Sequence, residues 1–312
     1  MADRANRART GHRDRVLVLL FPGQGSQRPG MLRPWLTLPG AQERLDHWSG
    51  LTGLDLTGLG TDAGAEELRD TAVAQPILPV AALLSAEAFV AAEGRGPDVV
   101  CGHSVGELAA AAVAGVLSFD EAVGLAGARG AAMAAAAAAV QTGMAAVLGG
   151  VDADVRRAAA DLGLEVATVN VAGQLVLGGA VGALDALAAA PPGRARIRRL
   201  DVAGAFHTRA MLPAVQELQR RVDALDAGTA TCPIVANADG AWLIDGREVL
   251  DRLVGQLTRP VRFDLCLASL TGATHVVEVA PGGVLAGLAK RALPTAQLSS
   301  LQTPADLPVG VG

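Results

Sequence analysis

The segment Gly102–Gly106, which reads G-H-S-V-G, constrains the fold of this chain more than any other stretch. It follows the apolar run Val99–Cys101 and leads into an alanine-rich stretch, so it predicts a strand, a sharp turn and a helix. A serine at such a turn stands clear of the sheet, and the first N–H groups of the helix point to where an oxyanion would form. Ser104 is therefore a candidate nucleophile in an α/β protein. In a chain with 38 glycines, a loop that matches this pattern by chance is the alternative.

The hydrophobic pattern elsewhere predicts a large α/β body that a smaller unit interrupts. In the first half we expect a strand over residues 16–21 and a turn over 22–27. Helices should follow around 42–48, 66–69 and 77–92, and Pro76 and Pro79 mark the first turn of the helix at 77–92. Two more helices are expected over 107–114 and 120–140, and Ser118 and Glu121 form a capping box at the start of the second. Residues 144–148, 166–170, 175–179 and 197–202 read as strands, with helices around 152–162 and 181–190 between them. This β-α-β-β-α-β order is typical of ferredoxin-like units. A strand over 275–280, a turn and a helix over 284–292 follow.

The expected fold is thus an α/β-hydrolase-like domain formed by residues 1–140 and 207–312, with 1–14 as a flexible tail. A ferredoxin-like subdomain over residues 141–206 is inserted into it.

The composition argues against several classes of protein. A net charge of −5 and few aromatic residues give nucleic acid neither an electrostatic partner nor a stacking surface. Gly or Pro interrupts the apolar runs before the ~20 residues of a bilayer span, and the run over residues 16–21 is too short for a secretory signal. Cys101, Cys232 and Cys266 are too widely spaced to suggest a disulfide framework or a zinc site. We expect a cytoplasmic monomer that binds no nucleic acid, membrane or metal.

Several motifs resemble, in order and spacing, those of the malonyl-CoA:acyl carrier protein transacylases of fatty acid synthesis and the related polyketide acyltransferase domains. The motifs are Phe21–Gln27 (FPGQGSQ), Ala74–Pro76 (AQP), Gly102–Glu107 (GHSVGE), Arg129-Gly130, Gly143-Met144, Gly204–Thr208 (GAFHT), Gln256 with Pro260-Val261, and Glu278–Gly283 (EVAPGG). The resemblance implies ping-pong transfer of malonyl from malonyl-CoA to the phosphopantetheine thiol of acyl carrier protein, through an ester on Ser104 and without a bound cofactor. The alternatives are an acyltransferase that loads polyketide synthase carrier proteins, a serine esterase or thioesterase, and an inert binding module.

The resemblance also implies how the serine is activated. His207 matches the family's catalytic histidine and would take the Ser104 proton, since imidazole has a suitable pKa. The main-chain carbonyl of Gln256 would orient His207, although Gln256 could also be a surface amide. A hydrolase would instead place an acid between serine and histidine in the chain, and Asp201 is the nearest candidate. The other histidines have simpler explanations. His12 belongs to the tail, His47 to an early helix and His275 to the end of a strand, and His103 should point to the far side of the turn.

The substrate pocket is implied by the same resemblance. The backbone N–H groups of Gln24 and Val105 would hold the oxyanion. Arg129 matches the family's carboxylate-binding arginine, so its guanidinium would bind the malonyl carboxylate. Its neighbours four residues away on the helix are apolar, which excludes a local ion pair and leaves a salt bridge to a distant residue as the alternative. Further pocket residues are expected to be Gln75, Asn170, Gln174 and Phe206, of which Phe206 would crowd the α-methyl group of methylmalonyl.

A run of arginines near His207 is the expected docking site for an acidic carrier protein. Arg196, Arg198 and Arg199 fall on one predicted strand, where alternation puts the first two on one face and Arg199 on the other. A solvated strand edge is the alternative explanation.

Overall fold

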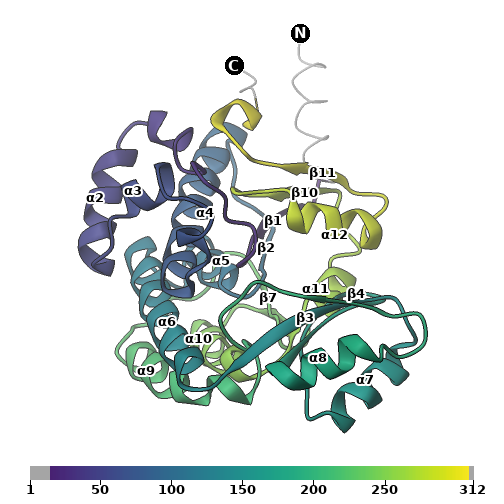
Figure 1. Cartoon of the computed structure of the whole chain (residues 1–312). Helices are drawn as coiled ribbons and strands as arrows, with labels where there is room; N and C mark the ends of the chain where they lie inside the picture. The colour runs from purple at the N-terminus through teal and green to yellow at the C-terminus, as the bar shows by residue number, and fades with distance from the viewer. Residues whose placement is uncertain (1–14, 309–312) are drawn as a thin grey trace.

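The computed structural model describes residues 15–308, which form two β-sheets and the helices that cover them (Figure 1). The predicted tail over residues 1–14, with His12, lies outside this range. The main sheet has six strands, in the order β11 (Gln297–Ser300), β10 (His275–Glu278), β1 (Leu17–Phe21), β2 (Val99–Gly102), β7 (Ile234–Val235) and β8 (Trp242–Leu243). Neighbouring strands are parallel except β7 and β8. The mixed α/β class expected from the sequence is confirmed.

Helices bury both faces of the main sheet. Leu17, Leu19 and Phe21 of β1 point into the larger core, whereas Val18 and Leu20 point into a second core. A continuous apolar run is what a parallel strand covered on both faces requires. The larger core is built with α2 (Ala41–Thr52), α3 (Leu56–Thr61), α4 (Thr71–Glu93), α5 (Gly106–Val113), α6 (Phe119–Ala139), α9 (Leu212–Asp223) and α10 (Gly246–Gly255), and the second with α11 (Phe263–Ser269) and α12 (Val284–Ala292).

Helix α4 begins at Thr71, earlier than the sequence pattern predicted. The Asp70 side chain accepts a hydrogen bond from Ala72 N at 2.8 Å and caps the helix there. Pro76 and Pro79 consequently lie inside the helix rather than in its first turn, because burial of its apolar face outweighs the hydrogen bonds that proline cannot make. Just before it, the helix expected over residues 66–69 is only a 3₁₀ turn, η2 (Glu67–Arg69). The capping box of Ser118 and Glu121 at the start of α6 is confirmed.

Within the described range, two helices, α4 and α6, have the length and composition of a membrane span. In the folded protein 83% of the apolar window of α4 and 50% of that of α6 are buried. The two helices pack against each other inside the larger core. Such burial is typical of core helices in a folded domain.

The smaller sheet lies below the main sheet in Figure 1, with α7 (Asp152–Asp161) and α8 (Val181–Ala189) on one face. Its strands are β6 (Arg196–Arg199), β3 (Thr142–Leu148), β5 (Gln174–Ala180), β4 (Glu165–Val171) and β9 (Val261–Arg262), in that order. The first four are antiparallel, and β9 adds a parallel edge from beyond the predicted insertion. Strand β6 ends at Arg199 rather than at Val202, because residues 200–202 leave the sheet and line the cleft between the two sheets.

Candidate functional site

A cavity of about 370 Å³ lies between the two sheets. The glycine-rich turn after β1, the nucleophile turn after β2 and the open face of the small sheet all contribute to its wall. The predicted catalytic and pocket residues that line it are Gln24, Gln75, Ser104, Asn170, Gln174, Phe206 and His207, and its wall also includes His103 and Asp201. Segments far apart in the chain therefore bring the candidate nucleophile, base and pocket residues to one place.

The turn that carries Ser104 needs glycine on both sides. A Cβ on Gly102 would lie 2.1 Å from Glu107 N, and one on Gly106 would lie 2.2 Å from Phe21 O. Ser104 itself has a φ of 54°, in the left-handed region that non-glycine residues rarely adopt. The G-x-S-x-G pattern is thus required here by close packing of the turn against β1 and the start of α5.

Ser104 and His207 form a hydrogen-bonded pair. Ser104 Oγ lies 2.7 Å from His207 Nε2, and His207 Nδ1 lies 2.8 Å from the main-chain carbonyl oxygen of Gln256. Because Nδ1–H donates to the carbonyl, Nε2 is left as the acceptor for the serine hydroxyl proton. Burial, then the positive charge of Arg129, lowers the pKa of His207 to about 3. The imidazole is therefore neutral in the resting protein, as a general base must be.

Arg129 lies beside this pair, buried on α6 with 2% of its surface exposed. Its Nη2 donates to Gln256 Oε1 at 2.8 Å and lies 3.4 Å from Ser104 Oγ, and its Nη1 donates to Gln75 Oε1. Within residues 15–308, no carboxylate comes within 4 Å of this guanidinium. Burial lowers the pKa of Arg129 to about 10, which leaves it charged at neutral pH. A buried cation held by neutral amides beside a nucleophile suits an anionic acyl group.

Two backbone N–H groups are available next to the serine. Neither Gln24 N nor Val105 N has a hydrogen-bond acceptor in the part of the chain that the structure describes. The loop that carries Gln24 approaches the nucleophile turn closely, since a Cβ on Gly23 would lie 2.4 Å from His103 O. The Gln24 side chain is held by Gln75, whose Nε2 donates to Gln24 Oε1 at 3.0 Å.

The alternative acid and the other histidines make no hydrogen bond to Ser104 in the part of the chain that the structure describes. Asp201 pairs with Arg69 at 2.9 Å, its side chain is 75% exposed, and within residues 15–308 it forms no hydrogen bond or ion pair with His207. His103 lines the cleft, although we expected it to point to the far side of the turn, and its Nε2 lies 3.0 Å from Asn170 Oδ1. The remaining described histidines, His47 and His275, bond Asp120 and Thr274.

The three arginines of the predicted docking strand differ in their surroundings. Arg198 pairs in register with Ala146, which lines the cleft, so Arg198 is on the cleft face of β6. Arg196 lies on the same face and, like Arg198, is exposed. Arg199 points the other way, where Nη1 binds Asp185 and the Val181 carbonyl at 3.0 and 3.1 Å.

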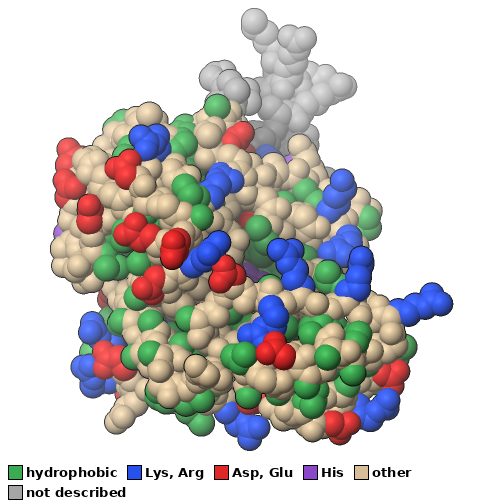
Figure 2. Space-filling view, in the orientation of Figure 1, with side chains coloured by type: hydrophobic (Ala, Val, Ile, Leu, Met, Phe, Trp, Pro, Cys, Tyr) green, Lys and Arg blue, Asp and Glu red, His purple; other side chains and the backbone are tan. Residues whose placement is uncertain are grey.

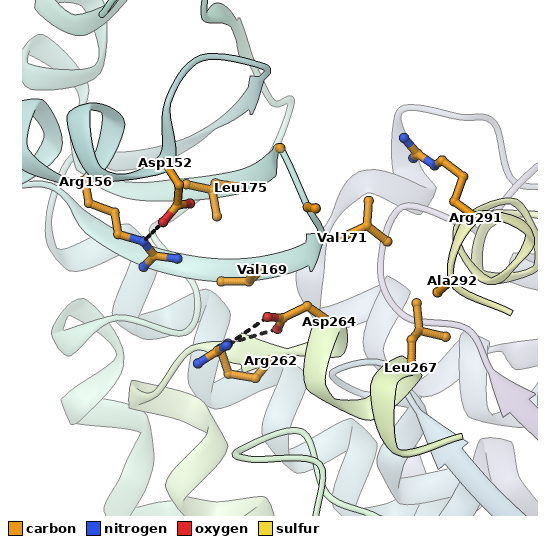
Figure 3. A pocket seen from close by; sticks show the side chains of 12 residues that line it. Asp152, Arg156, Val169, Val171, Leu175, Arg262, Asp264, Leu267, Arg291 and Ala292 are labelled. Carbon is orange, nitrogen blue, oxygen red and sulfur yellow. Dashed lines mark hydrogen bonds and ion pairs between the residues drawn. The ribbon is translucent and has the colours of Figure 1, made fainter. Parts of the chain in front are cut away.

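A larger cavity of about 650 Å³ lies on the opposite face of strands β4 and β5 (Figure 3). Val169, Val171 and Leu175 point into it, whereas the alternate residues Asn170 and Gln174 face the cleft. Figure 3 shows two arginine–aspartate pairs at its edges, and its lining contains no serine, cysteine or histidine. The larger cavity therefore lacks the side-chain types that the smaller cleft offers as nucleophile and base. Among the described residues, no three His, Cys, Asp or Glu side chains gather into a metal site.

Sequence reasoning missed two buried polar residues behind the serine, Glu107 and Asn237. Glu107 belongs to a motif that the sequence showed, but nothing in the pattern assigned it a role. Asn237 follows a strand of only two residues, so no local signal marks it. Both lie within hydrogen-bond distance of the segments that carry Ser104 and Gln256.

Comparison with known proteins identifies the family of this chain. The model of the acyl transferase domain family matches residues 18–303. A malonyl CoA-acyl carrier protein transacylase of Mycobacterium tuberculosis is 47% identical over 296 residues, which cover 94% of this chain and 98% of that protein. The crystal structure of MCAT from Mycobacterium tuberculosis aligns with a TM-score of 0.90 at 46% identity, covering 93% of this chain and 98% of that chain. A malonyl-transacylase solved in complex with a type II PKS acyl-carrier protein aligns with a TM-score of 0.86 at 30% identity, covering 94% and 99% of the two chains. The chain therefore belongs to the acyl transferase domain family, among the malonyl CoA-acyl carrier protein transacylases.

Proposed function

We propose that this chain transfers the malonyl group of malonyl-CoA to the phosphopantetheine thiol of acyl carrier protein and so supplies malonyl units to fatty acid synthesis. The observation that carries the proposal is the buried Arg129 guanidinium, which lies 3.4 Å from Ser104 Oγ without a carboxylate partner in residues 15–308. A hydrolase of uncharged esters has no use for such a cation. A malonyl group bound at Ser104 places its free carboxylate there.

The first half-reaction forms the malonyl ester. His207 Nε2 takes the Ser104 proton as Oγ attacks the thioester carbonyl, and the N–H groups of Gln24 and Val105 bind the oxyanion. Collapse of the tetrahedral intermediate breaks the carbon–sulfur bond, and His207 returns the proton to the CoA thiolate. In the second half-reaction His207 takes the proton of the carrier thiol, the thiol attacks the ester, and Ser104 leaves and recovers the proton. The Gln256 carbonyl holds the imidazole throughout, so the unit is a dyad with a neutral orienting group.

Arg129 also couples substrate binding to the strength of the base. Its positive charge helps to keep the pKa of His207 low in the resting protein, after burial as the larger cause. When the malonyl carboxylate pairs with Arg129, this charge is offset, and the pKa of His207 rises toward the range in which imidazole accepts a proton efficiently. An acyl group without a carboxylate lacks this effect.

The finer description of the fold belongs to this proposal. The four strands β6-β3-β5-β4, with helices after the first and third strands in chain order, support a ferredoxin-like subdomain over residues 141–206. The remaining residues, 1–140 and 207–312, then make up the α/β-hydrolase-like domain. We also infer a cytoplasmic monomer without bound cofactor, nucleic acid or membrane partner.

The carrier protein docks on the basic rim of the cleft in this proposal. Figure 2 shows Lys and Arg side chains gathered along the hollow between the main sheet with its helices, above, and the small sheet, below. Arg196 and Arg198 are exposed on the cleft face of β6 and form no ion pair within residues 15–308, whereas Arg199 is already paired with Asp185. Charge reversal of Arg196 and Arg198 should raise the KM for carrier protein and leave that for malonyl-CoA unchanged. Reversal of Arg220, an exposed arginine on α9, is the control.

The polyketide alternative shares every residue of the site and differs only in its carrier, and one aligned structure holds a type II PKS acyl-carrier protein. Transfer rates to a fatty-acid carrier and to a polyketide carrier, measured side by side, separate the two.

Intact-mass spectrometry tests the proposed reaction. The wild-type protein should gain a malonyl group from malonyl-CoA and lose it to carrier protein, Ser104→Ala should gain none, and Arg129→Ala should gain it slowly. The control Arg220→Ala should behave as the wild type. An adduct that is lost to water as fast as to carrier protein would favour the esterase alternative, and no adduct at all would overturn the proposal.

A further inference from the structure

Asn237 lies directly behind the nucleophile turn, and its side chain spans that turn. The residue follows β7 and is 1% exposed. Its Oδ1 accepts a hydrogen bond from Ser104 N at 2.8 Å, and its Nδ2 donates to Gly102 O at 2.7 Å. One planar amide therefore satisfies the backbone groups on both sides of His103. The Ser104 N–H precedes helix α5, so it has no partner within the helix and would be buried and unpaired without Asn237.

The same amide connects the nucleophile to the residue that orients the base. Gln256 Nε2 donates to Asn237 Oδ1 at 3.1 Å, to Ser104 O at 3.2 Å and to Glu107 Oε2. Asn237 N in turn donates to Glu107 Oε1 at 2.6 Å. The main-chain carbonyl of Gln256 holds His207, and its side-chain oxygen accepts from Arg129. The turn, the base and the anion-binding cation are thus tied to one network of buried polar groups.

We propose that Asn237 is a positioning residue that holds Ser104 in its left-handed conformation and fixes the serine turn relative to Gln256, and hence to His207 and Arg129. It touches no substrate atom and acts through these residues. The inference rests on the proposed role of Ser104 as nucleophile. A left-handed serine costs free energy, so it persists only where surrounding bonds determine it. The two bonds from Asn237 supply this constraint from outside the turn.

The chemistry of the contacts requires an amide at this position. Asparagine presents an acceptor to Ser104 N and Gln256 Nε2 and a donor to Gly102 O, which is the one orientation that satisfies all three. Asn237→Asp keeps the size and the acceptor but sets a carboxylate oxygen against the Gly102 carbonyl. Asn237→Ala removes both bonds and leaves Ser104 N–H and Gly102 C=O unpaired.

Single-turnover acylation by malonyl-CoA, followed by quenched-flow mass spectrometry, tests the proposal. We expect Asn237→Ala to lower the acylation rate on the order of 100-fold, the effect of a misplaced reacting group. The malonyl-CoA concentration for half-maximal rate should stay within about twofold, because Asn237 makes no ground-state contact with substrate. Asn237→Asp should be slowed in the same way. A fluorophosphonate probe reacts with Ser104 and needs His207 but not Arg129. It should likewise label Asn237→Ala and Asn237→Asp more slowly than the wild type.

The control is Ser85→Ala, which removes another buried side chain that binds a backbone N–H, that of Ala280 at 2.9 Å. It should lower the Tm without changing either rate. Wild-type rates in folded Asn237→Ala and Asn237→Asp would overturn the proposal, and so would failure of both to fold, which would make the role structural. If the wild type reacts with the fluorophosphonate but not with malonyl-CoA, the proposed function fails while the positioning role is still read from the probe.

Discussion

Glu107 is a carboxyl group buried inside the site, and replacing it with glutamine should change how the stability of the protein depends on pH. Burial raises the pKa of Glu107 from 4.5 to about 8, although hydrogen bonds from Asn237 N and Gln256 Nε2 oppose the rise. The folded state therefore holds this proton more tightly than the unfolded state does. Between these two pKa values the folded protein binds more protons than the unfolded chain, so its stability falls as the pH rises through that window.

The size of the effect follows from the shift. A change of this extent corresponds to about 5 kcal/mol in total, with a slope of up to about 1.4 kcal/mol per pH unit inside the window. The contribution is flat below the lower pKa and above the upper one. Glu107→Gln cannot titrate, so it lacks this slope, while every other group is shared by the two proteins.

Urea denaturation of wild type and Glu107→Gln between about pH 5 and pH 8 measures the difference directly. The absolute stability of the variant matters less than the slope, because a glutamine amide must also rearrange its contact with Gln256. We expect the free energy of unfolding of the wild type, relative to the variant, to fall by several kcal/mol across this range. Two parallel curves would refute the reasoning and would mean that Glu107 is ionised beside Gln256 at neutral pH.

Three further predictions concern specificity, the base and the fold. Phe206→Ala should raise the kcat/KM for methylmalonyl-CoA relative to malonyl-CoA by about 10- to 100-fold, which is the range of discrimination that one methyl group gives in a pocket. An unchanged ratio would mean that the Phe206 ring does not exclude the α-methyl group. Arg129→Gln should move the acid limb of kcat/KM for an uncharged acyl thioester to higher pH, because it removes a positive charge that lowers the pKa of His207; an unmoved limb would contradict this coupling. Ser118→Ala should cost about 1 kcal/mol of stability through loss of the α6 cap and leave kcat unchanged, as thermal melts and rates would verify.

The turn that carries Ser104 was predictable because its constraints are local. Glycines on both sides of Ser104, an apolar strand before it and a helix after it are visible in sequence, and the structure shows the steric contacts that demand them. Asn237 was not predictable, since its importance comes from long-range hydrogen bonds to a segment far away in the chain. The start of α4 was missed because Pro76 and Pro79 are strong local signals that tertiary burial overrides. Strand β9 was missed because two residues carry no periodic pattern, and only its partner β4 makes it a strand.

The attachment of β9 to the small sheet joins that sheet to the main body at one edge of the cleft. This edge is continuous with the segment that carries Gln256, and Arg262 N donates to Asn237 O at 2.7 Å, so it is joined to the serine turn. The opposite edge, β6, pairs only with β3 among the described strands and carries the exposed Arg196 and Arg198. The β9 edge therefore stiffens the cleft where it meets Gln256 and the serine turn, because any displacement of the small sheet at that edge must also move the backbone of Asn237.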